Sequence, residues 1–162
     1  MRAVGAYGDG MADTRTFRFW KDGYDHLAAL SATVKTSGLE APLLELVKMR
    51  ASQINGCAYC IDMHSKDARA AGETEQRLYA LPAWRETTFY TDRERGALAL
   101  TEAVTLIAGS HDTHAVAEEA SEHFSADEMS RLVYAIIEIN AWNRLVLTTG
   151  SPAAGSYRPP TP

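Results

Sequence analysis

Two cysteines, three residues apart, and a histidine four residues after the second are the side chains of this sequence best suited to chemistry. They are Cys57, Cys60 and His64, and the chain has no other cysteine. If a helix opens at Cys57, all three lie on one of its faces, because residues three and four apart are neighbours on a helix. The positive end of a helix dipole lowers the pKa of Cys-x-x-Cys thiols from about 8.5 to roughly 3.5–7.5. The spacing therefore predicts a nucleophilic thiolate, a second thiol able to form a disulfide with it, and a nearby base.

A carboxylate joins this set if the chain reverses between two helices. Asn55-Gly56 is a typical helix stop signal, and Pro42 suits the first turn of the helix before it. In an antiparallel hairpin with its turn there, Glu45 lies ~15 Å and His64 ~12 Å along their helices, at a rise of about 1.5 Å per residue. We therefore expect Glu45 to face His64, orient its ring and raise its basicity.

Each of these residues also has a plainer interpretation. Buried cysteines often pack as small apolar side chains, and a lone His64 or Glu45 fits an ordinary helix surface. A zinc site is a further alternative, because Cys57, Cys60 and His64 would supply three ligands. A closed structural zinc site uses four, and the sequence has no second Cys-x-x-Cys, so we expect no metal. The remaining histidines have no partner pattern and are interpreted as surface or capping residues: His26, His111, His114 and His123.

The elements that must position these residues are expected to be helices. Alanine is frequent in segments of helical spacing, and β-branched runs of alternating polarity are nearly absent, which indicates an all-α protein. Two capping boxes, Thr91-x-x-Glu94 and Ser125-x-x-Glu128, mark helix starts. The last helix is apolar on more than one side, so we expect it to be central or at a subunit interface. We expect about seven helices, with no significant sheet, at residues 17–35, 42–54, 57–71, 74–81, 91–108, 115–124 and from the second capping box to about 146.

Length and composition favour one soluble domain. A chain of 162 residues has the size of a single domain, which we assign to residues 14–150, with a flexible N-terminal arm at 1–13 and a Pro-rich tail at 151–162. The net charge of −5 argues against a nucleic-acid binder. The apolar runs are too short for a membrane span, and no secretory signal is visible. We therefore expect a cytoplasmic protein.

The motif Glu45-x11-Cys57-x2-Cys60-x3-His64 resembles the active-site pattern of the AhpD-like alkylhydroperoxidases of the carboxymuconolactone decarboxylase superfamily. The resemblance covers about residues 17–148, nearly all of the chain but its two ends. Further blocks have the form typical of the small stand-alone members, at residues 46–60, 70–75, 84–87, 89–95 and 139–144.

The resemblance implies an AhpD-like helical bundle, a homo-oligomer (a trimer, or a hexamer built as a dimer of trimers) and thiol peroxidase chemistry without a bound cofactor. By position, Cys60 matches the peroxidatic cysteine, which attacks the peroxide and becomes a sulfenic acid. Cys57 matches the resolving cysteine, which condenses with it to the disulfide. His64 and Glu45 match the proton relay that activates Cys60. The expected partners are a peroxide substrate and a dithiol protein or lipoyl carrier as reductant.

One residue departs from the family pattern. The best-known members have a relay histidine directly before the second cysteine, where this chain has Tyr59. A phenol with a pKa near 10 donates a hydrogen bond but is a poor base at neutral pH. Tyr59 is therefore either a relay or substrate contact or a packing aromatic.

Two other functions stay open from the sequence. The dithiol could serve a non-catalytic redox-sensing or stress-response protein, whose disulfide alters oligomer contacts. Carboxymuconolactone decarboxylation is the other, although it needs no dithiol and members with that activity generally lack the cysteine pair. Trp142 and Asn143 are interpreted as core and subunit-packing residues rather than substrate contacts.

Overall fold

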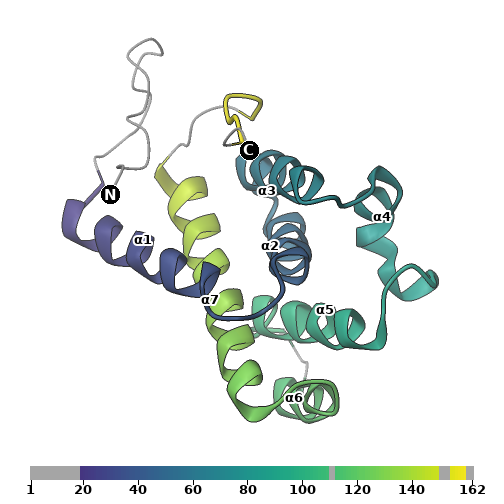
Figure 1. Cartoon of the computed structure of the whole chain (residues 1–162). Coiled ribbons are helices and arrows are strands. Elements are labelled where there is room, and N and C mark those ends of the chain that lie inside the picture. The colour runs from purple at the N-terminus through teal and green to yellow at the C-terminus, as the bar shows by residue number, and fades with distance from the viewer. Residues whose placement is uncertain (1–18, 110–111, 150–153, 160–162) are drawn as a thin grey trace.

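Helices make up the regular secondary structure of the residues that the structure describes. The computed structural model describes residues 19–109, 112–149 and 154–159, and no strand occurs within these ranges, so the predicted all-α fold is confirmed. The predicted arm at 1–13 lies outside them. The elements, shown in Figure 1, are α1 (Lys21–Lys35), α2 (Ala41–Asn55), α3 (Ala58–Ala70), α4 (Glu75–Ala80), the 3-10 helix η1 (Leu81–Glu86), α5 (Asp92–Thr105), α6 (Thr113–Ser121) and α7 (Ala126–Thr149).

Helix α2 is the central element of the bundle. It packs against α3, α5 and α7, which lie around it in Figure 1. Leu46 and Val47 are fully buried on it, and its apolar residues leave hardly any face for solvent. Glu45 therefore projects from a helix that is fixed by packing on several sides, which restricts the positions its carboxylate can take.

Helix α7 is the longest element and packs against α1, α2 and α5, as its apolar pattern predicts. It opens with the predicted capping box, in which the Ser125 N–H donates to Glu128 Oε2 at 2.8 Å and the Glu128 N–H donates to Ser125 Oγ at 3.3 Å. Further along, Trp142 Nε1 donates to Ser31 Oγ of α1 at 2.8 Å. This bond ties α1 to the second half of α7.

The end of α5 differs from the prediction. The helix begins at the predicted capping box but ends at Thr105, three residues before the expected end at 108. Leu106 leaves the helical conformation, with φ −98° and ψ 26°, and the Gly109 N–H donates to the Leu106 carbonyl oxygen at 2.7 Å. A tight turn therefore replaces the predicted last turn of the helix.

Two shorter segments also differ from their predicted bounds. Helix α6 begins at Thr113 rather than 115, because the Asp112 side chain caps it by accepting a hydrogen bond from the Ala115 N–H at 3.1 Å. The chain after α4 does not stop at Pro82 but continues as η1, where proline occupies an early position that needs no N–H donor.

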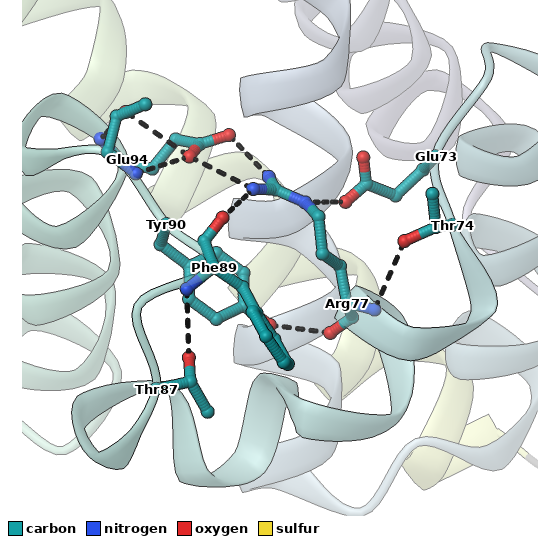
Figure 2. Close-up of polar contacts among 8 residues, drawn as sticks. Glu73, Thr74, Arg77, Thr87, Phe89, Tyr90 and Glu94 are labelled. Carbon is teal, nitrogen blue, oxygen red and sulfur yellow. Dashed lines mark hydrogen bonds and ion pairs between the residues drawn. The ribbon is translucent and has the colours of Figure 1, made fainter.

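Arg77 of α4 connects α4 to the start of α5 (Figure 2). Its guanidinium is hydrogen-bonded to Glu73, to the Phe89 carbonyl oxygen and to Glu94, the last with Nη2–Oε1 at 2.5 Å. Tyr90 donates from its hydroxyl to the Arg77 carbonyl oxygen at 2.5 Å. Glu94 also belongs to the capping box of α5, so one cation joins two helix starts and the loop between them.

Replacing Arg77 with methionine is expected to lower the free energy of unfolding by about 2 kcal/mol, because two largely buried carboxylates lose their cation. Arg69→Met is the control, since Arg69 pairs with Glu75 at the surface and such a pair contributes at most about 1 kcal/mol. Urea unfolding of both variants measures the difference. Equal losses in the two variants would contradict a structural role for the Arg77 contacts.

Candidate active site

The turn between α2 and α3 sets the position of both cysteines. Gly56 ends α2 in the left-handed conformation with φ 72°, which favours glycine. Cys57 then caps α3 from its N-terminal side, and its carbonyl oxygen accepts the first helical hydrogen bond, from Ile61 N–H at 2.9 Å. Cys60 therefore lies in the first turn of α3, where the helix dipole stabilises a thiolate.

Cys57 and Cys60 are joined by a disulfide in the structure, with their Cα atoms 5.3 Å apart. Both are buried, with exposed fractions of 0% and 2%. The structure thus holds the pair in its oxidised form, with both sulfurs within one helix turn. This is the juxtaposition of two thiols that the sequence spacing predicts.

His64 lies one turn after Cys60 on α3 and is bonded to Glu45 of α2, with Nδ1 and Oε2 2.8 Å apart. The imidazole and the carboxylate are 7% and 17% exposed. Burial raises the pKa of Glu45, but the hydrogen bond and charge of His64, together with the charges of Lys48 and Lys35, outweigh it and hold that pKa below its usual value. Glu45 is therefore ionised at neutral pH and fixes the ring through Nδ1, which leaves Nε2 as the nitrogen for proton exchange.

Asp67 and Tyr157 extend this cluster, and sequence reasoning found neither. Asp67 lies one turn after His64, and one ligand atom each from Glu45, His64 and Asp67 lie within 4.8 Å of one another. The Tyr157 hydroxyl donates to Asp67 Oδ1 at 2.8 Å and to Oδ2 at 3.0 Å. The one signal in the sequence was the three-residue spacing from His64 to Asp67, which puts both on one helix face.

The side chains of this cluster are also of the types that bind metal ions. Within the described ranges, Glu45, His64 and Asp67 are the group of His, Cys, Asp and Glu side chains close enough to share an ion. Hydrogen bonds already engage these side chains: Glu45 is bonded to His64, and Asp67 accepts from the hydroxyl of Tyr157. The zinc set considered from the sequence is a different one, and its two sulfurs are bonded to each other here. We assign no metal to this cluster.

Tyr59 precedes Cys60 in the sequence, and its side chain is half-buried. Burial raises its pKa, and the neighbouring Tyr24, Asp62 and Asp67 raise it further. Tyr59 therefore stays neutral at physiological pH and does not act as a base there. Its remaining roles are those of a hydrogen-bond donor or a packing aromatic, as the sequence suggests.

A buried amide network holds the end of α2 against α7. Asn55 donates from Nδ2 to Oδ1 of both Asn140 and Asn143, each at 2.9 Å. Asn143, which is fully buried, donates from Nδ2 to Ser52 Oγ at 3.1 Å. Because these three bonds join the last turn of α2 to α7, they fix the backbone that leads into Cys57.

The other histidines lie outside this cluster. His26 and His123 are exposed, and His114 is exposed beside Glu118, with Nδ1 and Oε1 3.7 Å apart. His111 falls outside the described residues. The three described histidines agree with their interpretation as surface residues.

The sequence profile of the carboxymuconolactone decarboxylase family matches residues 21–103 of the chain. This stretch is half of the chain and contains Glu45, both cysteines, His64 and Asp67. The chain belongs to the carboxymuconolactone decarboxylase family. Within the residues that the structure describes, this family member has no helix of sufficient length and apolarity to span a membrane.

Relatives and solved structures identify it as an AhpD-like member of the family. The uncharacterized protein YdfG of Bacillus subtilis is 45% identical over 120 residues, which are 74% of this chain and 82% of YdfG. A solved structure from Agrobacterium tumefaciens, of a protein of unknown function suggested to be the antioxidant defence protein AhpD, is 39% identical with a TM-score of 0.75, over 82% of this chain and 92% of that chain. The debrominase Bmp8 is 20% identical with a TM-score of 0.72, over 83% of this chain and 73% of that chain, which shows the fold alone.

Proposed function

We propose that the protein is a thiol-dependent peroxidase that reduces organic hydroperoxides or hydrogen peroxide through a Cys57–Cys60 dithiol and disulfide cycle. The observation that carries the proposal is the disulfide at the N-terminus of α3, one helix turn from a histidine held by a buried carboxylate. A thiol pair, a base and a group that orients the base are the parts that an activated cysteine nucleophile needs.

In the first step His64 accepts the proton of the Cys60 thiol, and the thiolate attacks the terminal oxygen of the hydroperoxide. The O–O bond breaks, Cys60 becomes a sulfenic acid, and the leaving alkoxide takes a proton to become the alcohol. Glu45 keeps the imidazole in position and stabilises the imidazolium that forms. The N-terminus of α3 stabilises the thiolate before attack.

In the second step the Cys57 thiol attacks the sulfur of the sulfenic acid. The S–O bond breaks, water leaves, and the disulfide seen in the structure forms. A dithiol or dihydrolipoyl carrier then reduces the disulfide by thiol–disulfide exchange and is itself oxidised to a disulfide. Over one cycle, one hydroperoxide and one reduced dithiol give one alcohol, one water and one oxidised dithiol.

The relatives support an antioxidant or peroxidase-related role more than the alternatives. One solved relative at 39% identity has a suggested antioxidant defence role. Carboxymuconolactone decarboxylation has no use for a dithiol. A redox sensor would form the same disulfide but would not turn over. The experiments therefore have to distinguish a sensor from a peroxidase.

We also expect the protein to act as a homo-oligomer, a trimer or a hexamer. Helix α7 exposes large apolar side chains, and others are exposed just before α1 and after α5. Such side chains suit contact with further copies of the chain better than contact with water. They are Tyr134, Ile137 and Leu147 on α7, and Trp20, Leu106 and Ile107 elsewhere.

A free-thiol assay tests the proposed reaction. Reduced protein is mixed with one equivalent of cumene hydroperoxide at pH 7, and free thiols and cumyl alcohol are measured over time. We expect two thiols per chain to disappear within seconds, with one alcohol formed for each disulfide. Thiols that survive for many minutes would contradict the peroxidase proposal and favour a sensory or structural role for the pair.

A further inference from the structure

The described part of the C-terminal segment, residues 154–159, lies along α3 (Figure 1, yellow). The Gly155 N–H donates to Asp62 Oδ2 at 2.9 Å, and Lys66 Nζ donates to the Tyr157 carbonyl oxygen at 3.0 Å. The next residue of α3, Asp67, receives the Tyr157 hydroxyl. Successive contacts on one side of α3 thus place a phenol from the far end of the chain beside the candidate active site.

The hydrogen bond from Tyr157 favours the ionised form of Asp67. Burial raises the pKa of Tyr157, and the bond to Asp67 raises it further, so the phenol stays protonated and donates. The pKa of Asp67 is raised overall, chiefly by burial and also by the charge of Glu45, and the hydrogen bond from Tyr157 limits this rise. The state of Asp67 therefore depends on a hydroxyl 90 residues away in the sequence.

Several other groups face Asp67 from the elements packed around it. Glu45 of α2 carries a like charge, and His64 on α3 and Lys35 at the end of α1 lower the pKa of Asp67. Tyr59 of α3 is also near, and stays neutral. Among the described residues, Tyr157 is the one that donates a hydrogen bond to the Asp67 carboxylate. Replacing Tyr157 with phenylalanine therefore removes the hydrogen bond that favours ionised Asp67 and keeps the rest of the side chain's shape.

We propose that Asp67 and Tyr157 are positioning residues for the reaction of Cys60, with the Tyr157 hydroxyl stabilising the anionic form of Asp67 beside His64. This inference rests on the proposed function. When His64 accepts the Cys60 proton, the imidazolium lies close to two carboxylates, Glu45 and Asp67, whose ligand atoms are within 4.8 Å of its own. Both positioning residues act through His64. The C-terminal segment is then part of the active site, outside the stretch that the family profile matches.

The test is the pH profile of Cys60 alkylation in Tyr157→Phe. Reduced full-length protein is treated with iodoacetamide from pH 4 to 9, and modification of Cys60 is followed by peptide mass spectrometry. Without the hydroxyl, the ionised form of Asp67 is less stable, so Asp67 protonates at higher pH. We expect the acidic limb of the profile to move up by about one pH unit, a roughly tenfold lower rate on that limb, with an unchanged plateau. Tyr79→Phe, a change at an exposed tyrosine of α4, is expected to leave the profile unchanged.

A second variant, Asp67→Asn, distinguishes the proposed role of Tyr157 from a purely structural one. In Asp67→Asn the titrating group is gone, so adding Tyr157→Phe is expected to cause no further shift of the limb. A purely structural role for Tyr157 would lower the rate by the same factor at every pH, or shift the limb equally in the Asp67→Asn chain, and either result would overturn the inference. A Tyr157→Phe profile that superimposes on that of the wild type would do the same. Because iodoacetamide replaces peroxide, this result stands apart from whether the protein reduces peroxides.

Discussion

Cys60→Ser is expected to abolish the reaction with peroxide, with the rate constant for thiol oxidation falling more than about 1000-fold. The serine hydroxyl keeps the size of the side chain at the start of α3, but it is not ionised at neutral pH and does not attack the O–O bond. Stopped-flow measurement of peroxide consumption by the reduced variant checks this result.

Cys57→Ser is the matched variant, because it removes the other sulfur of the same disulfide. It is expected to react once, at a rate close to that of the wild type, and to retain a sulfenic acid on Cys60 that dimedone traps. A sulfenic acid trapped on Cys57 in Cys60→Ser, with an unreactive Cys57→Ser, would contradict the assignment of the two cysteines. That pattern would leave the peroxidase chemistry intact but exchange the two roles.

Glu45→Gln is expected to lower the rate of Cys60 oxidation by about 100-fold at pH 7, the lower part of the range for loss of acid–base assistance. The amide has the shape of the carboxylate but no charge, so His64 Nδ1 loses an ionic partner at 2.8 Å. Stopped-flow oxidation of the reduced variant measures the loss. Glu122→Gln is the control, because Glu122 is exposed at the end of α6. Helices α6 and α3 lie at opposite ends of the bundle in Figure 1. Equal rates in the two variants would contradict a role for Glu45 in the relay.

The lowered pKa of Glu45 also predicts how the unfolding free energy of Glu45→Gln depends on pH. The pKa of the folded state lies below the ordinary value, so the ionised form contributes stability above pH 4.5 that is lost as pH falls through the folded pKa. The unfolding free energy of Glu45→Gln is therefore expected to fall below that of the wild type at pH 7 and to approach it near pH 3. Urea unfolding at several pH values measures this difference. A difference that grows toward acid pH would mean that Glu45 is not stabilised as an anion.

Local signals in the sequence predict the framework of the site. The Asn55-Gly56 stop, the capping residue Cys57 and the helical spacing to His64 are all short-range features, and each has the structure expected of it. That Glu45 and His64 face each other follows from the helical hairpin alone, because the rise per residue fixes how far along its helix each residue lies.

Contacts between distant segments were beyond the reach of the same reasoning. Tyr157 lies 90 residues from Asp67, in a segment with no periodic pattern to place it. Asn55 and Asn143 are 88 residues apart, and nothing in the type of either residue indicates that their amides meet. The missed end of α5 has a similar cause, because Leu106 and Ile107 continue an apolar pattern although the backbone has already turned. These features depend on how the helices pack.

Catalytic turnover with a defined reductant tests the proposed function most directly. Wild-type protein is mixed with excess cumene hydroperoxide and dihydrolipoamide, and cumyl alcohol and oxidised lipoamide are measured against the Cys57→Ser/Cys60→Ser double variant. A thiol peroxidase forms many alcohols per chain, with one lipoamide oxidised for each alcohol, and the double variant stays at the uncatalysed rate. A wild type that forms one alcohol per chain and then stops, with consumption no faster than in the double variant, would contradict catalysis and leave the disulfide as a redox sensor.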